Sequence, residues 1–288
     1  VGDQRSDESR HEPFTKDDAF AKIQRPRPSK LCNLTSNKYW LYILAQIKLE
    51  EWGLHPSLVR KLCSSIETLI VRGLRGSSNF VAYMIGTDIP DQYAVPVPSL
   101  NLRVVDFSHN DFLQMTRTQN VRFSFGIETI EFLNLQDLGL KAINYDLFFN
   151  MTSLRTLLLG QNHLNSTLEL NFTRNPNLAV LDLADNNISQ HTPNLLVGLT
   201  SLQQANLSGN GISEFNFNLE GLDNLMLLNL SNNKIRTINL PAQKMLSKLV
   251  LQNENLKLDL AGNILSCRCE DLHFIDWLQS SNIMYNPK

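Results

Sequence analysis

Cysteine, net charge and long apolar segments are all scarce in this chain. Four cysteines in 288 residues are too few for a scaffold held together by disulfides. The formal net charge is −2 at pH 7, so the sequence shows no electrostatic bias toward nucleic acid or anionic lipid. No run of about 18 apolar residues is present, and the best candidate for a membrane span, YWLYILAQI at 39–47, is too short.

Motifs that mark common enzyme and metal sites are also absent. The sequence contains no glycine-rich phosphate loop, no H-E-x-x-H and no G-x-S-x-G. The six histidines are scattered, and His109 and His163 are interpreted as exposed turn residues. We therefore expect no catalytic residue, no metal ligand and no cofactor, and the protein is predicted not to be an enzyme. The start of the chain lacks the pattern of a secretory signal peptide, which indicates either a cytosolic protein or a piece of a longer one.

Asparagine, by contrast, recurs within one repeated phrase. The pattern L-x-x-L-x-L-x-x-N-x-L fits four segments whose first residues lie 24, 24 and 23 positions apart: LRTLLLGQNHL (154–164), LAVLDLADNNI (178–188), LQQANLSGNGI (202–212) and LMLLNLSNNKI (225–235). Weaker copies occur at 44–54, 66–74, 102–112, 130–140, 246–256 and 256–265, which gives about ten coils in all. This is the leucine-rich-repeat signature, and its period falls in the range expected for it.

The repeat predicts an α/β fold, a leucine-rich-repeat solenoid shaped as a curved horseshoe, over residues 38–265. Short strands of successive coils are expected to form one parallel sheet on the concave side. The repeated asparagines are predicted to turn inward and pair with the backbone of adjacent coils, so their role is structural: Asn110, Asn162, Asn186, Asn210, Asn233 and Asn263. An apolar column that precedes the strands is predicted to fill the convex side: Phe148, Phe172, Leu196, Leu219 and Leu240.

Three features depart from the regular repeat. Residues 1–37 mix both charge signs without a repeat and are predicted to be a disordered or misassigned leader. Residues 77–99 hold three prolines and are predicted to bulge from the solenoid as an insertion, either as part of a binding face or without a function. Asp106 and Asp182 occupy x positions of the concave strands and are expected to be solvated surface residues.

The four cysteines fall into two pairs. Cys63 is predicted to be a small buried residue, with a Cys32–Cys63 disulfide as the alternative. Cys267 and Cys269 form a C-x-C just after the last coil, where a zinc site lacks ligands and a redox pair would favour C-x-x-C. A capping structure is the better account, since Leu272, Ile275 and Leu278 follow at helical spacing and an amphipathic helix could shield the end of the core.

The segment CRCEDLHFIDWL, following LDLAGN, resembles the C-terminal cap of Toll-like receptors. Related caps occur in other extracellular leucine-rich-repeat proteins, but the F-x-x-W-L form and the insertion-bearing repeats favour the Toll-like group. Ile264 departs from the pattern, since family members often have proline there. In that family the cap has four cysteines, so Cys267 and Cys269 would pair with later cysteines. Residues 266–288 are thus predicted to be a truncated cap.

The resemblance implies the ectodomain fragment of a pattern-recognition receptor of innate immunity. Such a receptor binds microbial or endogenous ligands, often proteins, and forms homo- or heterodimers. It lies on the extracellular side of a membrane as a single-pass protein, with a transmembrane helix and a TIR domain after the cap. The alternatives are another extracellular leucine-rich-repeat adhesion or secreted binding protein, or a cytosolic scaffold. The continuation of the transcript past Lys288 would separate them.

Candidate N-glycosylation sequons give weak support for a secretory route. They begin at Asn33, Asn150, Asn165, Asn171, Asn187, Asn206 and Asn229. Asn206 and Asn229 lie at x positions and are expected to point out of the concave sheet, where their glycans would crowd the concave face. Ligand contacts would then use the edges, the convex loops or the insertion. Deleting 77–99 is therefore expected to weaken binding more than mutating Asp182.

Overall fold

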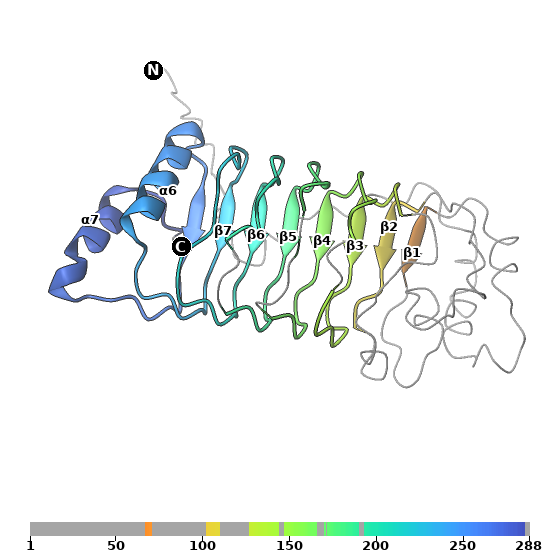
Figure 1. Cartoon of the computed structure of the whole chain (residues 1–288), viewed down its shortest axis with the longest axis horizontal. Coiled ribbons are helices and arrows are strands. Elements are labelled where there is room, and N and C mark those ends of the chain that lie inside the picture. The colour runs from red at the N-terminus through yellow and green to blue at the C-terminus, as the bar shows by residue number, and fades with distance from the viewer. Residues whose placement is uncertain are drawn as a thin grey trace, which may run out of the picture.

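Eight short strands and a helical C-terminal end make up the parts of the chain that the computed structural model describes. These parts are residues 67–70, 102–109, 127–143, 147–165, 170, 172–189 and 193–285. The strands stand side by side in chain order, and two α-helices follow at the C-terminal end (Figure 1). The strands are β1 (Thr68–Ile70), β2 (Val104–Asp106), β3 (Phe132–Asn134), β4 (Thr156–Leu158), β5 (Val180–Asp182), β6 (Gln204–Asn206), β7 (Leu227–Asn229) and β8 (Lys257–Asp259).

Every strand pairs in parallel with the next one, and the register is constant. The central residues of β2 to β8 therefore line up in one buried row: Val105, Leu133, Leu157, Leu181, Ala205, Leu228 and Leu258. Side chains alternate between the two faces of a strand, so the first and third residues of each strand face away from this core. We call the outer surface of the sheet the sheet face; it is the concave side of a leucine-rich-repeat solenoid. The predicted fold class is confirmed.

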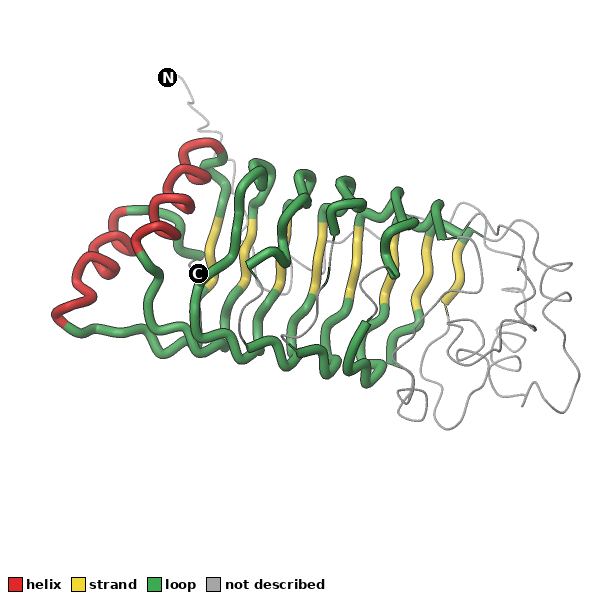
Figure 2. Tube along the Cα trace, viewed as in Figure 1, coloured by secondary structure: helices red, strands yellow, loops and turns green. Residues whose placement is uncertain are grey.

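Loops form most of each coil between the strands (Figure 2). Apolar residues of these loops join one continuous core. Phe148 and Phe172 stack with their ring centroids 5.8 Å apart, and Leu196 and Leu219 continue the column. The prediction fails at Leu240, which is 53% exposed. The chain enters a helix at this point, and Ile238 is buried instead.

Helix α6 (Leu240–Gln252) replaces the coil that the sequence predicted at 246–256. Asn239 caps it, since its Oδ1 accepts a hydrogen bond from the backbone N–H of Ala242 at 3.0 Å, and a proline stands in the first turn. Ala242, Leu246 and Leu249 follow the spacing of one helical face and are buried. Leu246 and Leu249, which fit strand positions in the sequence, thus lie on the inner face of a helix, whereas Leu251 is 86% exposed. Strand β8 comes only afterwards.

A second helix, α7 (Leu272–Ser280), follows a short 3₁₀ turn η3 (Cys269–Asp271) and covers the end of the core. Its buried face is formed by Phe274 with the half-buried Trp277 and Leu278, whose spacing of three and four residues places them on one side. The indole Nε1 of Trp277 donates to Ser247 Oγ on α6 at 2.8 Å. Leu272 was expected on this face but is 60% exposed, because it begins the helix on the opposite side.

The segment after α7 closes the open edge of the sheet. The N–H of Leu258 donates to the Ile283 carbonyl at 2.8 Å, and the N–H of Tyr285 donates back to the Leu258 carbonyl at 2.9 Å. An exposed strand edge would otherwise leave these backbone groups without partners. The C-terminal end is therefore covered both by a helix and by an extended segment.

Several predictions lie outside the described residues. These are the leader at 1–37, the coil at 44–54, the insertion at 77–99, the residues Cys32 and Cys63, and the asparagines Asn33, Asn110 and Asn171. The proposed boundaries of the solenoid at 38 and 265 stay predictions. Among the described helices, none has the length and apolar character needed to cross a bilayer.

Candidate functional site

In the described coils that contain it, the repeated asparagine lies inside the turn that ends the strand. Asn162 Nδ2 donates to the carbonyls of Leu135, Leu159 and Gly160 at 2.9 to 3.2 Å. Its Oδ1 accepts from the backbone N–H groups of Leu138 and Leu140. Asn186, Asn210, Asn233 and Asn263 make the same kind of contacts in the later coils. One amide side chain per coil thereby satisfies backbone groups of two coils.

A second polar row lies on the sheet face, at the last residue of each strand. We call it the Asx row: Asp106, Asn134, Asp182, Asn206, Asn229 and Asp259, with Leu158 as its one interruption between β2 and β8. In each member the side-chain Oδ1 accepts the backbone N–H two residues later, at 2.9 to 3.2 Å. This local bond is an Asx turn, which ends the strand.

The members of the Asx row are buried, which corrects the expectation of solvated carboxylates. Asp106 is 2% exposed and Asp182 is 7% exposed. Neighbouring coils pack these side chains against each other, and Asn134 Nδ2 donates to Asp106 Oδ2 at 3.3 Å. The row is therefore part of the scaffold, and the alternation of a strand alone does not decide whether an outward side chain reaches solvent.

The carboxyl group of Asp182 is electrostatically perturbed by its burial. Burial raises the pKa of its carboxyl group from 3.8 to about 6, and the charge of Asp185 adds to this. Hydrogen bonds from the backbone of Ala184 and the side chain of Asn206 act in the opposite direction. Gln136 Nε2 also donates to Asp182 Oδ2 at 3.2 Å across an intervening coil. The Gln136 side chain passes close to Gly160, which has no Cβ. A Cβ at this position would lie 3.1 Å from Gln136 Nε2.

Residues that a ligand could reach stand one position before each of the strands β1 to β7. We call this the leading row: Glu67, Arg103, Glu131, Arg155, Ala179, Gln203 and Met226. All of them are exposed or half-buried, in contrast to the Asx row. Charges alternate in sign from Glu67 to Arg155, and the row becomes uncharged from Ala179 onward. It therefore offers different chemistry to a ligand along the length of the solenoid.

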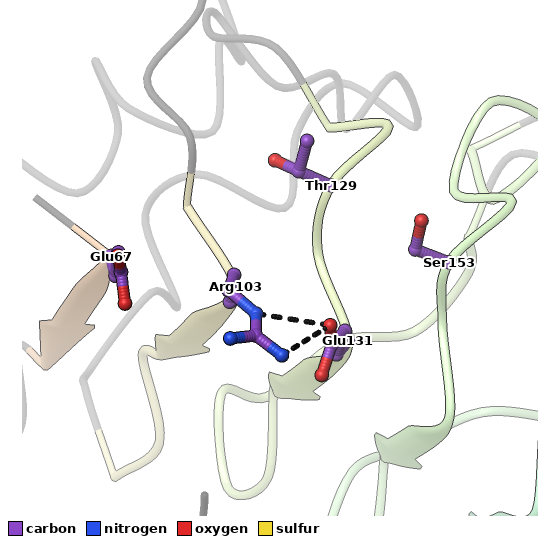
Figure 3. Close-up of a pocket in the computed structure, with 5 residues that line it drawn as sticks. All are labelled: Glu67, Arg103, Thr129, Glu131 and Ser153. Atoms are coloured by element: carbon purple, nitrogen blue, oxygen red, sulfur yellow. Dashed lines mark hydrogen bonds and ion pairs between the residues drawn. The ribbon is translucent and has the colours of Figure 1, made fainter. Parts of the chain in front are cut away.

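A shallow pocket of about 220 Å³ lies at the charged end of the leading row. Glu67, Arg103, Thr129, Glu131 and Ser153 line it, and they come from the residues around the starts of β1 to β4 (Figure 3). Arg103 Nε and Nη2 both donate to Glu131 Oε1, at 3.0 and 2.7 Å. Two carboxylates and one guanidinium give the pocket an excess of negative charge, so it suits polar or cationic groups.

An apolar cluster on the sheet face was missed by the sequence reasoning. Val104, Phe132 and Leu158 pack together there, separately from the main core. Val104 and Phe132 are the first residues of β2 and β3, and Leu158 occupies the position that the Asx row has elsewhere. The sequence feature that indicates this cluster is the presence of apolar residues at x positions of neighbouring repeats.

Sequence comparisons with known proteins agree with the repeat. A leucine-rich-repeat family model matches residues 169–212. A curated relative, a Toll-like receptor 4 from Pinctada imbricata, is 33% identical over 164 residues, which is 55% of this chain. The chain spans 18% of the length of that relative. An internalin from Listeria monocytogenes of known crystal structure is 21% identical with a TM-score of 0.43, over 64% of this chain and 52% of that one.

The chain folds as a leucine-rich-repeat solenoid. The repeated pattern L-x-x-L-x-L coincides with strands β2 to β7 of the sheet. The region 169–212, which the family model matches, contains β5 and β6. The predicted resemblance to Toll-like receptors is confirmed by the curated relative. Leucine-rich-repeat solenoids are typically binding scaffolds that present an extended surface, rather than enzymes. Among the described residues, no group of three or more His, Cys, Asp or Glu side chains could hold a metal ion.

The two cysteines in the described part of the chain are exposed thiols. Cys267 and Cys269 flank Arg268, which pairs with Glu270 at 2.7 Å and with Asp271 at 3.3 Å. Hydrogen bonding from Ser266 holds the pKa of Asp271 below its ordinary value, with the charge of Arg268 acting in the same direction. The local turn is therefore fixed by side chains other than the cysteines.

The sequons divide by exposure. Asn150, Asn165 and Asn187 are exposed, whereas Asn206 and Asn229 are members of the buried Asx row. Asn206 and Asn229 lie on the outer face of the sheet, as expected, but they are buried rather than exposed, because each folds back to accept a backbone N–H. The hypothesis that glycans force ligands off the concave face therefore loses its premise.

Proposed function

We propose that this chain is the ligand-binding part of a Toll-like pattern-recognition receptor ectodomain in innate immune signalling. The observation that carries the proposal is the 33% identity to a Toll-like receptor over more than half of the chain. The cap segment at 266–285 supports it, since α7 closes the solenoid where the resemblance expects a cap. The full-length protein would lie on the extracellular side of a membrane and signal as a homo- or heterodimer.

The leading row is the proposed contact surface for a protein or microbial ligand. Its side chains are accessible, while the Asx row beneath them fixes the ends of the strands. A ligand surface that is held by a rigid sheet loses little conformational entropy on binding. Arg155 is exposed and continues the alternating charges beyond the Arg103–Glu131 ion pair. It is therefore well placed for contact with an anionic or polar group.

The proposal is tested with full-length protein in reporter cells that are challenged with purified microbial glycolipids, lipopeptides and proteins. Arg155→Glu is expected to lower the response to the active ligand by about tenfold or more, the size of a typical hot-spot loss. Lys248→Glu on the exposed side of α6 makes the same charge change away from the sheet face and is expected to leave the response within about twofold. Equal loss in both variants would contradict the sheet-face contact.

The length of the natural transcript tests the receptor assignment itself. We expect an apolar span of about 20 residues and a TIR domain beyond the cap. An extracellular protein that binds a partner through the same face but has no TIR domain would instead be the adhesion or secreted binding protein of the alternative. No response to any member of the panel in cells that display the protein would also count against pattern recognition.

A further inference from the structure

Five sequon asparagines lie in the described residues, and they differ in their exposure to solvent. Asn150, Asn165 and Asn187 are exposed. Asn206 is 8% exposed and Asn229 is 3% exposed, although both occupy strand positions that face away from the core. The difference comes from the neighbouring coils, because both buried asparagines stand in the Asx row between side chains of the adjacent strands.

The side-chain amide of Asn206 forms hydrogen bonds on two sides. Its Oδ1 accepts from the backbone N–H of Ser208 at 3.2 Å and from Ser208 Oγ at 2.8 Å. The same amide hydrogen-bonds the carboxylate of Asp182 in the preceding coil. Ser208 is the hydroxyl residue of this sequon. The turn therefore uses both the asparagine to which a glycan would be attached and the serine that completes the sequon. A sugar on Nδ2 would have to displace the packing of a row whose strands are only about 4.8 Å apart.

Asn229 is held in the same way in the following coil. Its Oδ1 accepts from the N–H of Ser231 at 3.0 Å, and Ser231, the hydroxyl residue of that sequon, is fully buried. Asn206 and Asn229 are aligned across β6 and β7. Two glycans here would stand directly against each other on the sheet face.

The exposed sequons lie on the flanks of the solenoid. Asn165 and Asn187 form a parallel bridge between neighbouring coils, just after the turns that end β4 and β5. Asn150 lies in the turn that leads into β4, at the opposite ends of the strands. None of these three positions belongs to the Asx row or to the leading row.

We infer that, in the secreted protein, N-linked glycans are attached at the flank sequons Asn150 and at least one of Asn165 and Asn187, and are kept off Asn206 and Asn229. This inference rests on the proposed function, because attachment requires the secretory route. It leaves the sheet face over β5 to β8 free of sugar. That part of the leading row, from Ala179 to Met226, is then open to a large ligand.

Site occupancy in the natural full-length protein tests the inference. Glycans are released enzymatically in ¹⁸O-water, so that each occupied asparagine becomes a labelled aspartate in the peptide mass spectrum. We expect label at Asn150 and at Asn165 or Asn187, and none at Asn206 or Asn229. Label at Asn206 or Asn229 in folded protein overturns the inference but leaves the proposed extracellular function standing. An absence of label at all five positions overturns both.

Two matched variants check the result without changing an asparagine. Thr152→Ala removes the hydroxyl of the Asn150 sequon at an exposed position and is expected to lower the glycoprotein mass by one glycan. Ser208→Ala removes the hydroxyl of the Asn206 sequon and is expected to leave the glycan mass unchanged. A glycan lost in Ser208→Ala but not in Thr152→Ala would overturn the assignment.

Discussion

At the scale of single residues, Asn186 shows how one side chain joins two coils. Its Nδ2 donates to the carbonyls of Leu159, Leu183 and Ala184, each at 3.1 Å, and its Oδ1 accepts from the N–H of Leu164 at 3.0 Å. All four contacts are made with buried backbone groups, which need a partner within the protein. The side chain is therefore part of the backbone hydrogen bonding of the turn.

Replacing Asn186 should destabilise the protein. Asn186→Ala leaves buried backbone donors and acceptors unpaired, at a cost of about 1–3 kcal/mol for each group that finds no partner. Asn187→Ala, one residue later at an exposed position, is expected to change stability by less than about 0.5 kcal/mol. Urea unfolding of unglycosylated protein, followed by circular dichroism, measures both. Equal midpoints for the two variants would contradict a structural role for the amide.

Asp182 should make stability depend on pH. Its pKa is about 6 in the folded protein against 3.8 in the unfolded chain, so the folded state binds the proton more tightly between these values. The free energy of unfolding therefore falls as the pH rises from about 4 to 6, and the full loss, at most about 3 kcal/mol, is present above pH 6.

The Asp182→Asn variant should lose this part of the pH dependence, because its amide does not titrate. Unfolding midpoints measured from pH 4 to pH 8 are expected to be flatter for this variant than for the unchanged protein. Asp223→Asn, at an exposed position, serves as the control and should retain the original slope. A slope that survives in Asp182→Asn would mean that another group is responsible.

At the scale of elements, the two helices act as the end of the solenoid. Helix α6 packs Ala242, Leu246 and Leu249 inward, and α7 adds Phe274 beneath the Trp277–Ser247 hydrogen bond. A leucine-rich-repeat coil is stabilised by the coils on either side, so the last coil needs a substitute for its missing neighbour. The helix and the extended segment at 283–285 provide that substitute.

Loss of Phe274 should release this end. Phe274→Ala removes a fully buried aromatic side chain and is expected to cost about 3–5 kcal/mol, or to unfold the end locally. Leu272→Ala in the same helix removes a side chain that is 60% exposed and should have little effect. Hydrogen exchange over β8 and α7 distinguishes the two variants. Unchanged protection in Phe274→Ala would show that α7 does not hold the end.

At the scale of the whole molecule, the sheet separates two kinds of outward position. The Asx row closes strand ends and is buried by its own neighbours, whereas the leading row varies in chemistry and remains accessible. A solenoid can therefore keep its backbone geometry constant while its ligand surface changes. The proposed ligand contact of this protein depends on the leading row.

The sequence by itself determined the repeat, the fold class and the positions of the strands from β2 to β7. It could do so because L-x-x-L-x-L is a local pattern: alternate apolar residues have to be buried on one side of an extended chain. The same pattern misplaced one coil at 246–256. There, Leu246 and Leu249 fit both periods, and the cap at Asn239 together with packing against the core decided in favour of α6.

Only the tertiary structure decided which outward side chains meet solvent. Asp182, Asn206 and Asn229 occupy x positions, so the sequence placed them on the surface, yet they are buried by coils more than 20 residues away. The bond from Gln136 to Asp182 depends likewise on Gly160 in the coil between them. The burial of a side chain on the sheet face depends on its own coil and on the coils on either side. The sequence of a single repeat does not contain that information.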